Sequence, residues 1–365
     1  MRVLLLHNRY RLEGGEERAV ADIARLLAER GHQVEQIQRA SDGLSKARAA
    51  RALISGGERD SELEDALNHF RPNVVHAHNL HPLLGWRALA AAKRAGARTI
   101  LHLHNFRLVC AIGIAYREGQ PCHRCHGRNT LPGVRLGCRG QWAEALAYGV
   151  GLHRQQPHLI EHADRLVAVS AATATRLEQF GLPAATPLLN FVGDPAPATN
   201  AHLGTHALVS GRLVPEKGFD TAIEAARAAN VPLVVAGDGP DETRLRALAA
   251  GAEVRFTGRV SESELGELRR TAAVQLVPSR WEEPCPYSVL DALAAGVPVL
   301  ASNIGGLPEL VGETVQAGGW TEAVAALWDQ PEERLRQGEQ ALRRARENHS
   351  PERYYEQLLA LYEPR

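Results

Sequence analysis

The sequence predicts an α/β protein made of two doubly wound parallel-sheet domains in tandem. Three observations predict this fold class. Short apolar runs typical of buried strands alternate with runs of helical period along most of the chain. A segment rich in proline and small residues, 194–200, interrupts the alternation, which resumes after it. The chain of 365 residues is long for one domain and sufficient for two.

The first half, 1–193, reads as one such domain. Strands are expected at 2–7, 33–38, 73–78, 98–104 and 165–170. Helices are expected at 16–30, within 53–70, and at 82–95, 141–162 and 171–180. Residues 105–140 break the pattern and are rich in Gly, Arg and Cys, so we expect an irregular insertion there.

The second half repeats the pattern over 201–348. Strands are expected at 207–210, 232–236, 253–257, 274–278 and 297–301. Helices are expected at 219–230, 241–250, 262–270, 287–295, 321–329 and 331–348, and a last helix at 351–362 within a terminal segment 349–365. In parallel sheets the loops after the strands share one edge, and ligands bind there.

Composition limits the class of protein. Apolar content of 44% and charged content of 23% are ordinary for a soluble globular protein. No apolar run approaches the roughly 20 residues of a membrane span. We therefore expect a cytoplasmic protein, in contact at most with the inner face of a membrane, and no nucleic-acid partner.

Charge is divided unevenly between the halves. Residues 1–190 hold 25 Lys and Arg against 17 Asp and Glu, and residues 191–365 hold 17 against 25, which gives net charges of +8 and −8. The basic half favours an anionic partner, either a phosphorylated acceptor or an anionic membrane surface. Drift in surface composition is the alternative, and the basic run Arg39, Lys46, Arg48 and Arg51 is equally consistent with a solvated helix face.

A loop and helix start at 279–299 carries the first chemical signal. Glu282 and Glu283 precede a loop with two prolines, and Asp291 lies eight residues after Glu283, in the second turn of the expected helix. A helix N-terminus offers amide groups and positive charge to a phosphate. Two acids on either side suit the hydroxyl groups of a sugar nucleotide. An ordinary βαβ connection with solvated acids is the alternative.

A second loop follows the first strand of the second half. Arg212 and Lys217 lie between Gly211 and Gly218, where a strand gives way to a helix. Two cations beside glycines that permit close approach suit a diphosphate, although a solvated loop is the alternative. Lysine is rare in this chain, at three of 42 basic residues. Gly237 and Gly258 follow two further strands, but each alone is only a turn signal.

Two clusters could bind a metal. His76 and His78 on one strand, and His102 and His104 on the next, share a face and could bind zinc, although cleft-lining or packed histidines are the favoured interpretation. Four cysteines fall in the insertion with one C-x-x-C spacing, which is compatible with a structural zinc site or with four free thiols. Disulfides are disfavoured in a cytosolic protein. These cysteines are Cys110, Cys122, Cys125 and Cys138.

In order along the chain, GGEER at 14–18, GRLVPEKG at 211–218, GDGP at 237–240, FTGRV at 256–260 and the Glu283–Asp291 pair followed by ALAAGVPVLAS resemble the retaining glycosyltransferases of family 4. The resemblance covers nearly the whole chain. It implies the GT-B fold, in which two Rossmann-like domains face a cleft. The first domain would bind the acceptor and the second the nucleotide-sugar, and the last helix would cross back to the first domain.

The resemblance also implies an activity and its residues. A sugar would pass from a nucleotide-sugar, UDP- or GDP-linked, to a glycan, lipid-linked or small-molecule acceptor, without a cofactor or catalytic metal; no D-x-D triplet occurs. Polysaccharide biosynthesis is the expected context. The implied catalytic residues are Arg212 and Lys217 on the diphosphate, Glu283 on the donor sugar, and His104 near sugar and acceptor. The implied donor-binding residues are Gly15, Gly211, Gly237, Gly258, Arg259, Val260, Pro286, Tyr287, Ser288, Val289, and Asp291 on the ribose.

Two positions depart from the family pattern. Asp291 stands where glutamate is usual, so its reach toward a ribose is one methylene shorter. Asn105 stands where aspartate is common, which puts an acid–base role there in doubt. Two other functions stay open: a GT-B sugar-nucleotide epimerase, which the pairings of Arg212 with Lys217 and of Glu283 with Asp291 disfavour, and a catalytically silent sugar-nucleotide-binding protein.

Overall fold

The computed structural model describes residues 1–10, 14–193 and 200–363. Most of the predicted linker, 194–199, lies outside the described residues. The chain divides into two compact units. Unit 1 comprises Met1–Ala115, Cys122–Leu189 and Tyr355–Arg365, and unit 2 comprises Tyr116–Pro121 and Asn190–Tyr354.

Unit 1 is built on a parallel sheet of six described strands, in the order β2-β1-β3-β4-β7-β8. The order reverses between β1 and β3, which is the point where doubly wound sheets bind ligands. The short edge strand β8 was not predicted. The strands are β1 (Arg2–Arg9), β2 (Gln33–Ala40), β3 (Val74–Ala77), β4 (Arg98–Leu103), β7 (Arg165–Ala168) and β8 (Thr186–Pro187).

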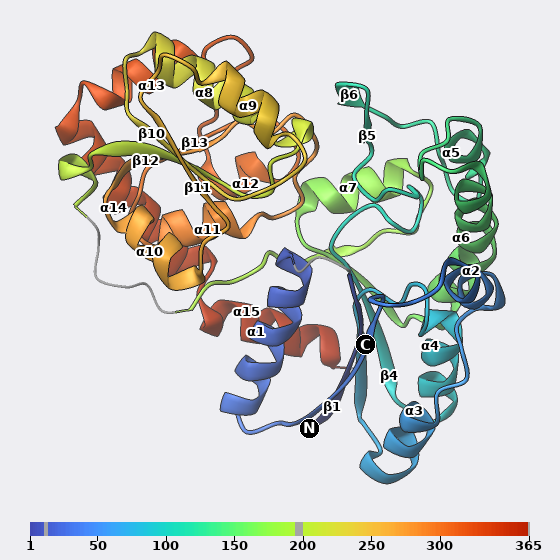
Figure 1. Ribbon diagram of the computed structural model, residues 1–365. Coiled ribbons are helices and arrows are strands. Elements are labelled where there is room, and N and C mark those ends of the chain that lie inside the picture. Colours follow the sequence, from blue (N-terminus) through green and yellow to red (C-terminus); the bar gives the residue numbers. More distant parts are fainter. Residues whose placement is uncertain (11–13, 194–199, 364–365) are drawn as a thin grey trace. The chain divides into compact units, whose positions relative to one another are not determined.

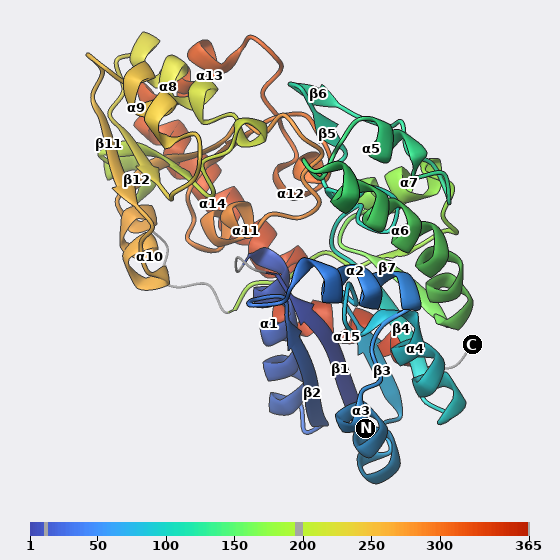
Figure 2. The same ribbon diagram turned by 45° about the vertical axis from the view of Figure 1, so that its right-hand side comes forward.

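Helices cover both faces of this sheet. Figures 1 and 2 show α2, α4 and α6 on one side, and α1 with the end of α15 on the other. The end of α15 is tied to the sheet by a hydrogen bond of 2.8 Å between Tyr362 and His76. The helices are α1 (Gly15–Glu29), α2 (Lys46–Ser55), α3 (Ser61–Asp65), η1 (Ala66–Phe70), α4 (Gly85–Arg94), α6 (Trp142–His162), α7 (Ala171–Gln179) and α15 (Pro351–Tyr362).

The helix predicted within 53–70 is present as α3 and η1, which follow one another over residues 61–70, whereas α2 was not among the predicted helices. Helix α2 begins at Lys46, where the Ser45 side chain accepts a hydrogen bond from the Arg48 amide. It ends at Gly56, with φ of 92°. At Gly57 a Cβ would lie 2.1 Å from the carbonyl oxygen of Leu84, so the chain turns there and only short helical turns follow.

The insertion 105–140 is largely irregular, as predicted. It contains a two-residue hairpin, β5 (Tyr116–Arg117) with β6 (Gln120–Pro121), and one short helix, α5 (Leu131–Arg135).

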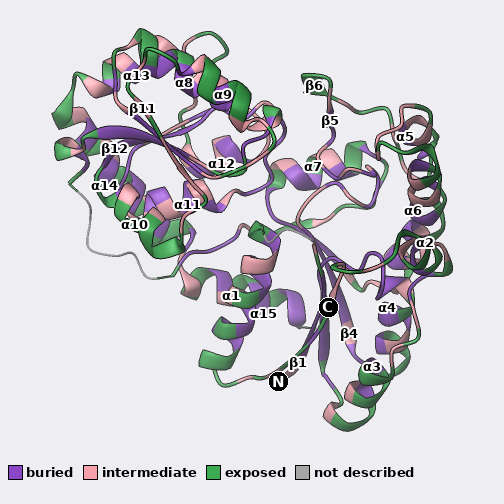
Figure 3. Cartoon of the chain, in the orientation of Figure 1, coloured by how far each residue is buried: buried purple, intermediate pink, exposed green. Residues whose placement is uncertain are grey.

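Unit 2 has a parallel sheet of five described strands in the order β11-β10-β9-β12-β13. Here the order reverses between β9 and β12. Figure 3 shows the middle strands buried and the helices exposed on their outer faces. The strands are β9 (His206–Ser210), β10 (Leu233–Ala236), β11 (Val254–Gly258), β12 (Ala272–Val277) and β13 (Val299–Ala301).

The helices of unit 2 follow the predicted order, with the short η2, η3 and α12 as additions. They are η2 (Ala201–Leu203), η3 (Pro215–Lys217), α8 (Phe219–Ala228), α9 (Glu242–Leu248), α10 (Glu262–Arg270), α11 (Tyr287–Ala294), α12 (Leu307–Val311), α13 (Trp320–Trp328) and α14 (Pro331–Asn348). Across the part of the chain that the structure describes, no helix combines the length and apolar character needed to cross a membrane.

Candidate functional site

In unit 2, two of the predicted residues meet where the strand order reverses. Lys217 follows β9 and Glu283 follows β12, and Lys217 Nζ lies 2.5 Å from Glu283 Oε1. The same oxygen accepts a hydrogen bond of 2.7 Å from the Ser279 hydroxyl. The Glu283 side chain is 3% exposed and that of Lys217 is 26% exposed. A buried carboxylate is therefore held by a cation that still reaches solvent.

Three of the predicted glycines lie side by side at the same edge of the sheet. The Gly237 amide donates to the Gly258 carbonyl at 2.8 Å. A Cβ on Gly237, whose φ is 139°, would lie 1.9 Å from the carbonyl oxygen of Gly211. The chains after β9 and β10 therefore approach more closely than a side chain at Gly237 would allow, and a backbone hydrogen bond joins the chain after β10 to the end of β11. A side chain is also excluded at Gly218, because a Cβ added there would lie 1.9 Å from the Pro278 carbonyl oxygen.

Helix α11 begins immediately after the acidic loop. Pro286 is its N-cap residue and makes no side-chain capping hydrogen bond, and the Val289 amide donates to the Pro286 carbonyl at 3.1 Å. Tyr287 is buried and Ser288 is partly exposed. The uncapped helix start carries the partial positive charge that anions prefer.

Asp291, which stands where the family usually has the longer glutamate, forms an ion pair. Its Oδ2 lies 3.1 Å from Arg269 on α10, and both side chains are largely buried, at 13% and 8% exposed. The structure does not bring Asp291 to the Lys217–Glu283 contact. Arg212 and Arg259 are exposed, and Val260 packs against a small apolar cluster.

Unit 1 has a small pocket, of about 30 Å³, at the corresponding edge of its own sheet. Its walls come from the segments that follow β1, β3 and β4, on both sides of the point where the strand order reverses. Its polar lining comprises Tyr10, Glu16, His78, Asn79, His81, His102, His104, Asn105 and Arg107.

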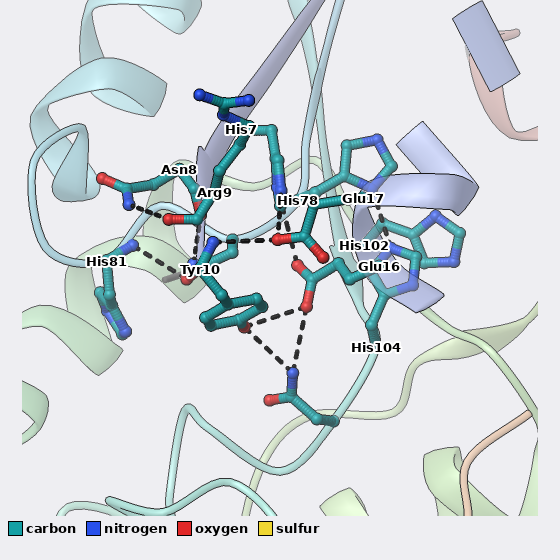
Figure 4. Close-up of polar contacts among 12 residues, drawn as sticks. His7, Asn8, Arg9, Tyr10, Glu16, Glu17, His78, His81, His102 and His104 are labelled. Carbon is teal, nitrogen blue, oxygen red and sulfur yellow. Dashed lines mark hydrogen bonds and ion pairs between the residues drawn. The ribbon is translucent and has the colours of Figure 1, made fainter. Parts of the chain in front are cut away.

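A buried carboxylate, Glu16, organises this pocket (Figure 4). Its Oε2 accepts hydrogen bonds from the Tyr10 hydroxyl at 3.0 Å and from the Asn105 amide at 3.2 Å. Burial raises the pKa of Glu16, and nearby His7 opposes that rise. The Arg107 guanidinium stacks over the Tyr10 ring at 4.6 Å. Asn105 therefore serves as a donor to Glu16, which an aspartate at this position could not do when ionised.

The neighbouring Glu17 differs from Glu16. Burial would raise its pKa, but the His7 side chain, 3.5 Å away, and the amides of Tyr10 and Gly14 outweigh that effect, so its pKa is lowered. Glu17 thereby fixes the start of α1, where Gly15 is exposed. The two adjacent glutamates at the start of α1 therefore differ in acidity: the pKa of Glu16 is raised and the pKa of Glu17 is lowered.

The histidines predicted from β3 and β4 form a stacked group. His76 Nε2 is hydrogen-bonded to His102 Nδ1 at 3.2 Å, and His78 Nδ1 is hydrogen-bonded to His104 Nε2 at 2.8 Å. Desolvation lowers the pKa of all four, to about 3 at His76 and at His104, so they are neutral at physiological pH. The ligand nitrogens of His76, His78 and His102 lie within 4.8 Å of one another, close enough to hold a metal ion by distance alone.

Sequence reasoning identified Gly15 and His104 in unit 1 but missed Glu16, His7 and Tyr10. A signal existed for Glu16. It lies three and seven residues before Ala19 and Ile23, on the face of α1 that is buried, and a charged residue on a buried face needs partners. His7 and Tyr10 carry no comparable pattern.

Comparison with known proteins agrees with this architecture. The family model "Glycosyltransferase Family 4" matches residues 13–188, and "Glycosyl transferases group 1" matches residues 204–344. Together they account for both units.

The individual proteins that resemble the chain are distant from it in sequence. The chain is 30% identical over 257 residues to a GDP-mannose-dependent alpha-mannosyltransferase of Mycobacterium tuberculosis, covering 67% of this chain and 59% of that protein. It is 32% identical over 285 residues to the D-inositol 3-phosphate glycosyltransferase of Corynebacterium glutamicum, covering 67% and 62%. The chain thus spans about 60% of the length of these relatives.

Solved structures match over the whole chain. HepE of Anabaena, in complex with UDP and glucose, matches with a TM-score of 0.64 at 17% identity, covering 99% of this chain and 98% of that one. Sucrose-phosphate synthase of Thermosynechococcus elongatus matches with a TM-score of 0.72 at 15% identity and the same coverage. The predicted fold class is confirmed: two Rossmann-like units of the GT-B type. The chain belongs to the group 1, family 4 glycosyltransferases.

Proposed function

We propose that the chain is a retaining glycosyltransferase that needs no catalytic metal and moves a sugar from a UDP- or GDP-sugar to a glycan, lipid-linked or small-molecule acceptor. The observation that carries the proposal is the contact of Lys217, Glu283 and Ser279 where the strand order of unit 2 reverses. This is the edge at which α/β sheets bind nucleotides.

Unit 2 would bind the donor. Lys217 and the exposed Arg212 supply positive charge to the diphosphate, which gains negative charge as the glycosidic bond breaks. The uncapped start of α11 at Pro286 adds to that charge. Glu283 Oε1 is held by Lys217 and Ser279, so the carboxylate is oriented to accept a hydrogen bond from a sugar hydroxyl.

Unit 1 would bind the acceptor. A neutral His104 can both donate and accept a hydrogen bond at the pocket wall. Glu16, held by Tyr10 and Asn105, places a carboxylate in the same pocket. These groups suit a hydroxylated acceptor.

The basic run of unit 1 gives little support to a membrane-bound acceptor. Arg39 pairs with Asp60 and Glu62, Arg48 with Glu58, and Lys46 with Glu144. Cations that are already paired attract anionic lipids weakly. A contact with an anionic membrane would need other residues.

A catalytically silent sugar-nucleotide-binding protein is a second candidate, and one observation favours it. Asp291 is paired with the largely buried Arg269, which reduces its capacity to bind a ribose. Donor binding without turnover would fit this reading.

The test measures nucleotide release from UDP-, GDP- and ADP-sugars by the purified chain, with analysis of the sugar product. We expect slow release from at least one donor, and at least a roughly hundredfold loss in Lys217→Ala. Lys93→Ala is the matched control, because that ammonium is 42% exposed and pairs with Asp164 in unit 1. An epimerised donor would instead support an epimerase.

Lys217→Ala leaves Glu283 buried without its cation, so loss of folding must be separated from loss of chemistry. The double variant Lys217→Ala with Glu283→Gln removes both charges of the pair. We expect it to fold like the unmodified chain by circular dichroism and to stay inactive. Unchanged donor affinity and turnover in Lys217→Ala would refute the proposed function.

A further inference from the structure

Four of the five cysteines lie within 29 residues of the insertion, between Cys110 and Cys138, and none forms a disulfide in the described chain. All four are partly exposed, whereas Cys285 in unit 2 is buried. The four cysteines of the insertion take no part in the proposed catalysis, so their clustering has another cause.

Local hydrogen bonds fold the insertion so that the cysteines are not spread along it. The Cys122 amide donates to the Ala115 carbonyl at 2.7 Å, which closes the base of the β5–β6 hairpin. The Cys110 carbonyl accepts from the Gly113 amide at 2.9 Å. The first two cysteines are therefore held on either side of one turn and one hairpin.

The second pair converges on α5. The Cys138 amide donates to the Gly133 carbonyl at 3.0 Å. Cys125 Sγ lies 3.5 Å from the position that a Cβ of Gly133 would take. Both cysteines therefore contact the same glycine, one on its carbonyl and one on its Cα side.

The C-x2-C spacing joins the two pairs. Cys122, at the base of the hairpin, lies three residues before Cys125, which lies beside α5. Cys110 and Cys125 both pack against the apolar core of unit 1. A cation can hold four such thiols together as thiolates.

We infer that Cys110, Cys122, Cys125 and Cys138 bind one zinc ion that fixes the insertion. Zinc is the metal favoured by four thiolates, and the Cys122-x2-Cys125 spacing is a common ligand spacing. The segment has little apolar content of its own between Arg117 and Asn129, where most residues are exposed, so it has little core to hold it. A metal supplies that restraint in small irregular segments.

The inference requires the sulfurs to move closer together. Ligands around zinc at about 2.3 Å from the metal lie roughly 3.8 Å apart. Among the described side chains, the groups of three or more whose ligand atoms lie mutually within 4.8 Å contain no cysteine. Zinc binding should therefore tighten the insertion, including Arg107 at the pocket wall, three residues before Cys110.

The test is the metal content of the full chain, purified without a metal-affinity tag and dialysed against metal-free buffer, by inductively coupled plasma mass spectrometry. We expect close to one zinc per chain, and background zinc in Cys122→Ser/Cys125→Ser. The matched control Cys285→Ser should keep its zinc. Exchange with cobalt should give thiolate-to-metal charge-transfer bands, which histidine ligands would not give.

A second measurement covers the case in which the double variant does not fold. Titration of the unmodified chain with a mercurial should release zinc in proportion to thiols modified. Zinc retained by Cys122→Ser/Cys125→Ser would assign the metal to a group without cysteine, either His76, His78 and His102 or His158, Glu161 and His162, and overturn the inference. Background zinc in the unmodified chain, or a disulfide among the four cysteines, would also overturn it.

Discussion

Unit 2 places an ammonium and a carboxylate in contact at the edge of its sheet, where Gly211 and Gly237 let two loops approach closely. Unit 1 places neutral histidines and two buried or partly buried glutamates at the corresponding edge of its sheet. The first arrangement suits a ligand of fixed negative charge, such as a diphosphate. The second suits hydroxyl groups and proton movement.

The comparison predicts different responses to acid, and this is the largest effect we expect. Burial lowers the pKa of six histidines in the described part of unit 1, His32 and five around the ends of β3 and β4, to about 4 at His81 and about 3 at His76 and His104. Their folded pKa values lie below the unfolded value, so the folded state binds fewer protons than the unfolded state. The contribution of these histidines to the free energy of unfolding is therefore complete above a pH of about 6.5 and is lost as the pH drops toward 4.

At pH 5, His76 and His104, whose pKa values are about 3, should each cost about 2 kcal/mol of folding free energy relative to neutral pH, and the other histidines act in the same direction. Unit 2 carries lowered pKa values at His206 and His349 in the described chain, so it should lose less. Hydrogen exchange followed by mass spectrometry at pH 7.5 and 5, corrected for intrinsic exchange, resolves the two units. Equal loss of protection in both units would contradict the comparison.

The second prediction concerns the close approach of loops in unit 2. Gly237→Ala should destabilise the unit by about 3 kcal/mol, since its Cβ would overlap the Gly211 carbonyl at a φ of 139°. Gly251→Ala is the control, with a φ of 79° and no atom within 4 Å of the Cβ position, and should cost about 1 kcal/mol. Urea unfolding followed by tryptophan fluorescence measures both. Similar losses would show that the Gly237 contact is not required.

The third prediction concerns the carboxylate of unit 1. In Glu16→Gln the amide oxygen can replace Oε2 and keep both hydrogen bonds, from Tyr10 and Asn105, while the charge is lost. The raised pKa of Glu16 means that its ionisation opposes folding above the unfolded pKa. Glu16→Gln should thus be more stable at neutral pH, with the difference vanishing near pH 4.

The same variant should lower the proposed transfer activity about tenfold, which is about 1.4 kcal/mol. Glu16→Ala is the comparison that removes the hydrogen bonds as well, and it should lose stability. Thermal unfolding across pH and turnover at saturating donor are the measurements. A Gln variant that is both less stable and fully active would refute this view of Glu16.

The two sites also differ in how far sequence predicts them. In unit 2, Lys217 and Glu283 could be predicted, because glycines and charges that follow strands mark one sheet edge whatever the rest of the fold does. In unit 1, His7 contacts Glu17 across ten residues, but Asn105 reaches Glu16 across 89, and no local pattern encodes that pairing.

Other failures have local physical causes. Helix α2 was not predicted, because only Ala52 and Leu53 among its ten residues are buried and its apolar period is therefore weak. The edge strand β8 has only two residues, too short for an alternation to show. The pairing of Asp291 with Arg269 was also invisible, since the two residues lie on separate helices.

The smallest expected effect tests that last pair. Asp291→Glu adds one methylene, which lets the carboxylate reach beyond Arg269 Nη2, now 3.1 Å from Asp291 Oδ2, toward a ribose. Leaving Arg269 costs free energy because that side chain is 8% exposed. The net gain in nucleotide affinity should therefore be only about threefold, below 1 kcal/mol.

Asp291→Asn is the control for the prediction, because it keeps the length of the side chain and removes its charge. It should weaken nucleotide binding and destabilise unit 2, since the buried Arg269 loses this ion pair. Isothermal titration calorimetry with UDP and GDP, beside urea unfolding, separates the two roles. If Asp291→Glu binds nucleotide more weakly than the unmodified chain, the aspartate serves chiefly to hold Arg269, and unit 2 must bind the ribose through other groups.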